Sequence, residues 1–326
     1  MRRFGRWLGR GLLGAVALGA LLYVFGPYEP VDTDVSFDAR QLDGGVGAYF
    51  ARVESAYGDI TEGVEKRVIW AGEAEARSPL ALLYIHGFSA TSEEIRPVPD
   101  RVAQALGANL VYTRLTGHGR GGAAMAEARA GDWMRDTAEA LAVARAVGEE
   151  VIVISTSTGG TLVALAMLDP AMREGVRGAV FLSPNFGIND PMAWALTLPA
   201  ARGFVPLVIG AERSWGAVNA LQEKYWSTRY PSVAVLPMAA LVKEAVARDY
   251  SGVGVPALFH YAQEDQVVDA KATAQLAARW GGAVHSVVLA PEAEVEDSRH
   301  VLAGDIVSPK QTEAAVDMIL SWIKGL

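Results

Sequence analysis

Ser157 lies in a local sequence that could turn a serine hydroxyl into a nucleophile. Residues 151–162 read VIVISTSTGGTL: an apolar run, a turn of small residues and the opening of a helix. On a sharp strand-to-helix turn a base can reach the hydroxyl, and backbone N–H groups can face a developing oxyanion. Ser155 and Gly159 are small enough for the strand and helix to approach closely there.

The segment departs from the G-x-S-x-G pattern because Ser155 replaces the first glycine. Ser155 is a weaker candidate nucleophile, since the residue two positions beyond it is Ser157 rather than glycine. The serines could also do no more than cap the helix of an ordinary strand-to-helix turn. We favour Ser157 because an apolar strand precedes it and candidate catalytic partners follow it.

The elements that must position this serine are typical of a layered α/β domain. Short apolar runs alternate with helical patterns, and several runs are continuous, as in strands buried on both faces of a parallel sheet. The pattern predicts a mostly parallel central sheet with helices on both faces. Strands are expected at Arg67–Trp70, Leu80–Ile85, Asn109–Thr113, Val151–Ser155, Gly178–Leu182, Ala257–Tyr261 and Ser286–Leu289, and helices near 93–106, 132–147, 159–169, 269–280 and 310–324.

One interval interrupts the alternation. About 70 residues, from Pro184 to Gly254, separate two strands and include Trp194, Trp215 and Trp226. A plain loop of this length is uncommon in a compact domain, so we expect a helical cap inserted at about 184–254 over one end of the sheet. The cap belongs to a domain expected at 61–326, and the polar stretch 27–60 is expected to be a linker leading into a short helix.

These segments resemble the α/β-hydrolase superfamily, particularly its capped branch of carboxylesterases, monoacylglycerol lipases and serine aminopeptidases. The resemblance covers roughly residues 66–325 and rests on the Ser157 turn, on LLYIHGFS at 82–89 and on the late segment LFHYAQEDQVV at 258–268. It implies the α/β-hydrolase fold and acyl transfer through an acyl-enzyme on Ser157, with no cofactor and no metal. It also implies an oxyanion hole formed by the backbone N–H groups of Phe88 and Thr158.

The resemblance places the catalytic acid after a late strand, often before a pair of valines, which indicates Asp265. Its role would be to hold the tautomer of a histidine and to stabilise the imidazolium. The neighbouring acids Glu264 and Asp269 are the alternatives, and each could be an ordinary solvated carboxylate.

The base should follow the acid, because the chain order in this fold is serine, acid, histidine. Of the chain's five histidines, His260 precedes Asp265, and His285 opens a strand where we expect it to face the sheet. His300 lies in a polar loop after the last strand and is therefore the predicted base. His86 is expected to be structural, and His118, in a Gly-His-Gly segment like that of the family, to shape its loop.

The tryptophans and leucines of the cap suggest a site for an apolar acyl group, although they could equally form the cap's own core. We therefore expect hydrolysis of short- to medium-chain acyl or monoacylglycerol-like esters. An aminopeptidase or amidase is the alternative; it would need acidic cap residues to bind an amine, and Glu212 and Glu223 are available. A non-catalytic binding protein of the same fold is a further alternative.

Composition excludes several other classes. The 326-residue chain has no cysteine, which removes disulfides, thiolate nucleophiles and cysteine metal sites. Its net charge of −8 becomes −12 when the four arginines of the first ten residues are left out. An acidic body is a poor partner for nucleic acid.

The N-terminus predicts export. Arg2, Arg3, Arg6 and Arg10 are followed by an apolar run from Gly11 to Gly26, which is roughly 24 Å long as a helix and slightly shorter than the ~30 Å hydrocarbon core. We expect residues 1–26 to be a membrane anchor with the arginines inside and the catalytic domain outside the cytoplasm. A signal peptide cleaved near Ala17-Leu18-Gly19 is the alternative, and a buried core helix is a third.

Overall fold

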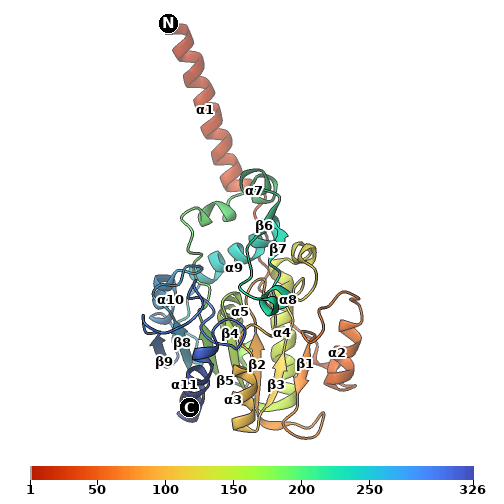
Figure 1. Ribbon diagram of the computed structural model, residues 1–326. Coiled ribbons are helices and arrows are strands. Elements are labelled where there is room, and N and C mark those ends of the chain that lie inside the picture. The colour runs from red at the N-terminus through yellow and green to blue at the C-terminus, as the bar shows by residue number, and fades with distance from the viewer. Residues whose placement is uncertain (1) are drawn as a thin grey trace.

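Seven strands form one central sheet in the computed structural model, which describes residues 2–326 but not the side chains of 2–10 and 15 (Figure 1). The order across the sheet is β1-β3-β2-β4-β5-β8-β9. β1 pairs antiparallel with β3, and every other pair is parallel. The strands are β1 Arg67–Ile69, β2 Ser78–Ile85, β3 Asn109–Tyr112, β4 Gly148–Thr156, β5 Val176–Leu182, β8 Ala257–Tyr261 and β9 Val284–Val288, which confirms the seven predicted strands within a few residues at each end.

Helices cover both faces of the sheet because its central strands are apolar on both sides. On one face, Val151 and Val153 of β4 pack in a cluster with α2 Val46–Glu54, α4 Ala130–Val147, α5 Thr158–Leu168 and α10 Ala270–Ala277. On the other, Ile152 and Ile154 pack with α3 Val98–Leu106 and α11 Thr312–Lys324. Successive side chains of a strand point to opposite faces of the sheet, and both faces are covered by helices, so β4 is apolar at successive positions.

The edge strand β9 corrects one expectation. His285 was expected to face the sheet, yet it is exposed, as are Val284, Ser286 and Val288. β9 pairs only with β8 among the described strands, so its outer side stays open to solvent.

The cap lies between β5 and β8 and is not wholly helical. It contains a two-stranded antiparallel sheet that the sequence did not predict, because these strands are three residues long and do not alternate. The last helix of the cap, α9 Val235–Ala247, packs against α5 through Leu241 and Ala245, which are part of the main core. The cap elements are η3 Ala193–Thr197, α7 Ala201–Ile209, β6 Glu212–Ser214, α8 Ala220–Tyr225, β7 Arg229–Pro231, η4 Ser232–Ala234 and α9 Val235–Ala247.

The N-terminal residues form α1, Arg2–Phe25, which projects away from the body beside α7 (Figure 1). Within the residues that the structure describes, no helix is both long and apolar enough to cross a membrane. The side chains of the four arginines lie outside the described part. The end of α1 is fixed to the cap: Ala200 N–H donates to Pro27 O at 2.7 Å, and Arg202 pairs with Glu29.

The segment expected to be a linker, residues 27–60, contains η1 Ala39–Leu42 and helix α2. Val46, Tyr49 and Phe50 of α2 are buried in the main core, so this helix is packed against the body. The remaining short elements are η2 Gly122–Ala126, α6 Pro170–Arg173 and η5 Pro309–Gln311.

Candidate active site

Ser157 sits on a tight turn between β4 and α5, where its φ is 52° and ψ is −117°. A positive φ is unusual for a residue with a side chain, and such strain often marks a functional position. The turn also explains Gly159: a Cβ there would lie 2.2 Å from the Ile85 carbonyl oxygen on the neighbouring strand. The strand-turn-helix context expected for a nucleophilic serine is therefore present.

Ser155 shows how the chain does without the first glycine of the pattern. Its side chain is fully buried on β4, and its hydroxyl donates a hydrogen bond to the Val180 carbonyl of β5 at 2.9 Å. The hydroxyl is thus satisfied within the sheet, and Ser155 is not available as a nucleophile.

Asp265 and His300 are in direct contact, with 2.8 Å between Asp265 Oδ2 and His300 Nδ1. The other oxygen, Asp265 Oδ1, accepts the N–H groups of Val267 and Val268 at 2.8 and 2.9 Å. The valine pair that marked this acid in the sequence therefore fixes its carboxylate. Because His300 donates through Nδ1 to Asp265, its Nε2 is left without a proton in the neutral ring and can act as a base.

The loop that carries His300 is held by Glu296. Oε1 of Glu296 accepts His300 N–H at 2.7 Å, Val301 N–H at 3.0 Å and the Ser298 hydroxyl at 2.6 Å. Burial would raise the pKa of Glu296, but these hydrogen bonds outweigh it and hold the pKa below the usual range. Glu296 is therefore ionised at neutral pH.

The environment of His300 favours its protonated form. Burial lowers the pKa of His300, but the contact with Asp265 and the nearby Glu94 and Glu296 carboxylates raise it, so that it lies above the ordinary value. A histidine with a raised pKa is a stronger base, and the imidazolium formed during proton transfer is stabilised.

The two expected oxyanion donors lie at the ends of β2 and β4. Thr158 is the first residue of α5, where a backbone N–H has no partner inside the helix. Phe88 follows His86-Gly87 after β2, and in the described part of the chain its N–H donates no hydrogen bond. Both amides are thus available to an oxyanion near Ser157.

The site residues follow β2, β4, β8 and β9, whose carboxyl ends meet at one edge of the parallel sheet. Ser157, Asp265 and His300 are each less than a tenth exposed. No hydrogen bond joins Ser157 Oγ to His300 Nε2 among the described residues, and such contacts are often long without substrate.

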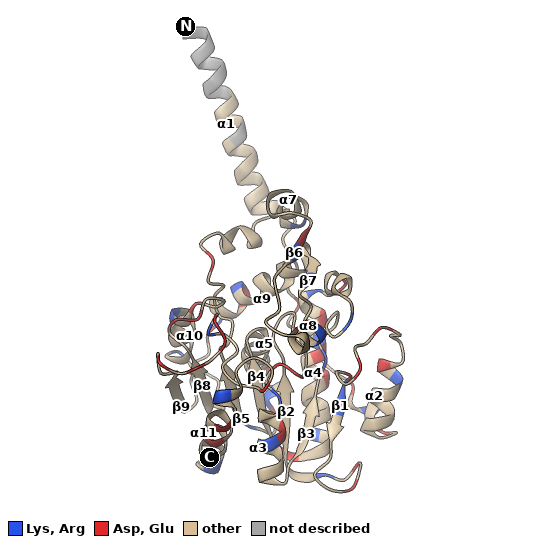
Figure 2. Ribbon diagram, viewed as in Figure 1, with Lys and Arg blue, Asp and Glu red and all other residues tan. Residues whose placement is uncertain are grey.

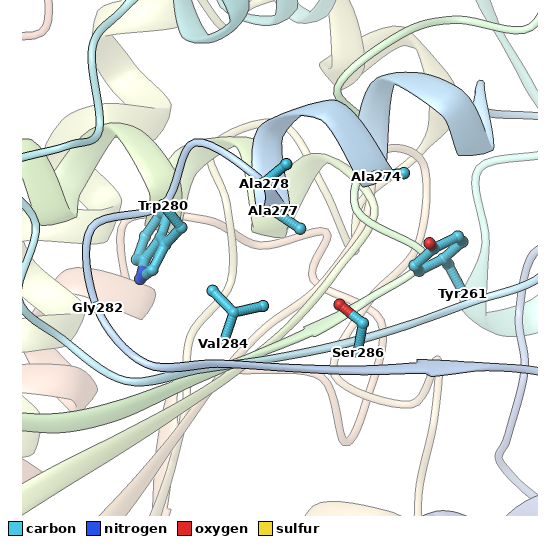
Figure 3. A pocket seen from close by; sticks show the side chains of 8 residues that line it. All are labelled: Tyr261, Ala274, Ala277, Ala278, Trp280, Gly282, Val284 and Ser286. Atoms are coloured by element: carbon cyan, nitrogen blue, oxygen red, sulfur yellow. The ribbon is translucent and has the colours of Figure 1, made fainter.

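A separate hollow lies between α10 and β9 (Figure 3). Tyr261, Trp280 and Ser286 line it, together with three alanines of the α10 segment and two residues at β9. It contains none of the predicted site residues and no acid or histidine, so it does not compete with the Ser157 site.

His86 and His118 take the structural places expected of them. His86 is fully buried, accepts Leu115 N–H through Nε2 at 3.1 Å, and has its pKa lowered to about 4 by burial. His118 is buried between Phe88 and Trp133, and burial together with His86 lowers its pKa well below the ordinary value. Neither ring is placed to act as the base.

Sequence analysis missed Glu94 and Glu296. Glu94 Oε2 accepts Gly87 N–H and the Tyr84 hydroxyl, each at 2.8 Å. Both acids lie in acidic loop segments, EE at 93–94 and EVED at 294–297, in which nothing distinguishes a buried carboxylate from its solvated neighbour. A weak signal existed for Glu296 alone, which lies in the polar loop after the last predicted strand, whereas Glu94 fell at the start of the helix predicted near 93–106.

The sheet order, the strained serine turn and the Asp265–His300 pair define an α/β-hydrolase. The family described as serine aminopeptidase, S33, matches residues 77–294, and the chain belongs to this family. No curated protein matches the chain.

Several solved structures share the fold. The chain is similar to a structure of the metagenome-derived lipolytic enzymes LipS and LipT, with a TM-score of 0.66, 21% identity and coverage of 82% of this chain and 100% of that chain. A soluble variant of the monoglyceride lipase of Saccharomyces cerevisiae has a TM-score of 0.57, 12% identity, and coverage of 81% and 92%. The monoacylglycerol lipase of Paleococcus ferrophilus has a TM-score of 0.54, 14% identity, and coverage of 79% and 98%.

Proposed function

We propose that the protein hydrolyses carboxylic esters through an acyl-enzyme on Ser157, with His300 as base and Asp265 as its orienting acid. The observation that carries the proposal is the 2.8 Å contact between Asp265 Oδ2 and His300 Nδ1, at the sheet edge where Ser157 occupies its strained turn. The names of the structural neighbours, which are lipolytic enzymes and monoglyceride lipases, agree with this class of substrate.

In the proposed reaction, His300 Nε2 takes the Ser157 hydroxyl proton while Oγ attacks the ester carbonyl carbon. The backbone N–H groups of Phe88 and Thr158 stabilise the oxyanion, and His300 returns its proton to the leaving alcohol. Water then attacks the acyl-enzyme by the same route, releasing the carboxylic acid and restoring Ser157. No cofactor or metal takes part in these steps.

The apolar surface of the cap favours a substrate with an acyl group of short to medium length, or a monoacylglycerol-like ester. Tyr230 and Val205 belong to an apolar cap cluster against which the partly buried ring of Phe88 packs, and the rings of Phe88 and Tyr230 are 5.2 Å apart. Apolar cap surface therefore reaches the residue that supplies an oxyanion donor. An acyl chain leaving this centre would meet hydrocarbon rather than charge.

An aminopeptidase or amidase is the second candidate, because the family description names serine aminopeptidases. An amine substrate would need a carboxylate in the cap facing the site. Glu212 and Glu223 are both exposed; Glu212 pairs with Arg229, and Glu223 accepts the Thr228 hydroxyl. Their surroundings favour the ester over the amine.

We further propose that the N-terminal segment tethers the domain to a membrane, with the catalytic part outside the cytoplasm. The part of α1 whose side chains the structure describes, 11–14 and 16–25, carries no charged residue (Figure 2), and its large apolar side chains, such as Leu13, Val16 and Phe25, are all about half exposed or more. An all-round apolar helix calls for an apolar environment, and the described residues of this chain do not supply one. Protease added to intact cells would test whether the catalytic part lies outside the cytoplasm, and extraction of the membrane fraction would test the tether.

The test of the function is a panel of aryl esters of rising acyl length beside aminoacyl aryl amides, with Ser157→Ala as control. We expect turnover of esters, with kcat/KM highest for short to medium chains, and a loss of about 10⁴-fold or more in Ser157→Ala. Faster turnover of amides than of esters would replace ester hydrolysis by the second candidate. Full activity in Ser157→Ala would remove the serine mechanism.

A further inference from the structure

Glu94 is a buried carboxylate beside the Ser157 site that the steps above do not use. It lies between β2 and α3, is 2% exposed, and accepts Gly87 N–H and the Tyr84 hydroxyl through Oε2. The same Tyr84 oxygen is 3.1 Å from Oγ1 of Thr156, the residue before Ser157. Carboxylates are rarely buried so completely without a compensating role, because burial disfavours their charge.

The second oxygen, Oε1, lies close to the reacting serine. A Cβ on Gly87 would be 2.7 Å from Glu94 Oε1 and 3.1 Å from Ser157 Cβ. Both side chains therefore lie against Gly87, the residue immediately before Phe88. Among the described residues Glu94 Oε1 accepts no hydrogen bond, so both hydrogen bonds of this carboxylate are made by Oε2.

Glu94 is also electrostatically coupled to His300. Three carboxylates act on this ring: Asp265 in direct contact, then Glu94 and Glu296, and each raises the pKa of His300 against the effect of burial. In return, burial raises the pKa of Glu94 above its ordinary value, although Gly87 N–H, the Tyr84 hydroxyl and His300 act in the opposite direction. Tyr84 and His300 are thus the titratable groups that face Glu94.

We propose that Glu94 is a positioning residue of this site, which fixes the Phe88 loop through Gly87 N–H and presents a further carboxylate, beside those of Asp265 and Glu296, to the His300 imidazolium. The first role places an oxyanion donor, and the second supports the base. The inference rests on the proposed roles of Ser157 and His300. It adds that a carboxylate from the loop after β2 supports the base, beside Asp265 after β8 and Glu296 after β9.

The two roles can be separated by substitution. Glu94→Gln keeps an oxygen that can accept Gly87 N–H and the Tyr84 hydroxyl, but it removes the charge. Glu94→Ala removes both. The matched control is Glu93→Gln, because the neighbouring Glu93 carboxylate pairs with Arg67 and Arg96 and is not among the main charges that raise the pKa of His300.

The measurement is the pH dependence of the rate at which a fluorophosphonate labels Ser157 in the full chain, together with kcat/KM on an aryl ester. The pH dependence reports the pKa of the free enzyme's base, which a purely structural role would not move. Loss of a nearby negative charge lowers the pKa of His300, so its neutral form persists to lower pH. On the acid side of the rate-against-pH profile, we expect the apparent pKa to fall by roughly 0.5–1 pH unit in Glu94→Gln and to stay unchanged in Glu93→Gln. This side of the profile is the acid limb.

Above the acid limb, where kcat/KM no longer changes with pH, Glu94→Gln should keep kcat/KM within about threefold of the wild type. Glu94→Ala should lose about 10- to 100-fold in this plateau value, because the Phe88 loop is no longer held through Gly87 N–H. An unmoved acid limb in Glu94→Gln would overturn the charge role. Full plateau activity in Glu94→Ala would overturn the loop role, and if this variant fails to fold, the Gln variant still decides the charge role. No labelling of Ser157 in the wild type would instead overturn the proposed function, and this inference with it.

Discussion

The catalytic edge of the sheet and the outer cap differ in how their residues are held. At the edge, Asp265 is fixed by two backbone N–H groups and the His300 loop by Glu296, and the side chains are buried. In the outer cap, Leu207 is 84% exposed and Trp194 is 59% exposed. In the proposed function, the reacting groups are therefore positioned by hydrogen-bonded loops at the sheet, while the acyl group meets a cap with large exposed apolar side chains.

This contrast predicts that edge substitutions change kcat by orders of magnitude. Replacing Asp265 by Asn should lower kcat by about 10³–10⁴-fold, because an amide no longer holds the His300 tautomer or stabilises its imidazolium. Steady-state kinetics on an aryl ester would measure the loss. Asp269→Asn is the control: Asp269 caps α10 through Lys271 N–H, so its loss should lower the melting temperature slightly and leave kcat within about twofold. Equal kinetic losses in the two variants would contradict the assignment of the acid.

A smaller effect is expected at Glu296, which holds the His300 loop but is not one of the three proposed catalytic residues. Glu296→Gln leaves an NH₂ group facing a backbone N–H of its loop, so we expect a loss of about 2 kcal/mol in the free energy of unfolding and about tenfold in kcat. The exposed neighbour Asp297 is the control, since Asp297→Asn should change neither quantity.

The charge of Glu296 also makes this loop sensitive to acid. The pKa of Glu296 is lowered in the folded protein, so its contribution to stability is present above the pKa of the unfolded chain and is lost as the pH falls through the folded value. The wild type and the Gln variant should therefore converge in stability at acid pH, as chemical denaturation would show. A constant difference between them down to pH 2 would contradict this role.

The same contrast explains how far sequence alone could lead. The seven strands were predictable because buried parallel strands are continuous apolar runs. The chain order serine, acid, histidine was enough to select Ser157, Asp265 and His300 as candidates after β4, β8 and β9, and their catalytic roles stay predictions. The short strands β6 and β7 were not predictable, since three residues are too few to show a periodic signal. Glu94 was missed because its burial depends on Tyr84 and Gly87, which come together only in the folded chain.

The smallest expected effect tests the cap itself. Tyr230 belongs to the apolar cap cluster and contacts Phe88, so Tyr230→Ala should raise KM for a medium-chain aryl ester by about tenfold while changing the acetate ester little. Leu207→Ser removes an exposed side chain of α7 and should leave both substrates unchanged. Equal losses on acetate and medium-chain esters in Tyr230→Ala would mean that this cluster positions the oxyanion loop rather than the acyl chain. Apolar surface in the cap would then contribute to stability, and the acyl chain would have to be bound elsewhere on the sheet edge.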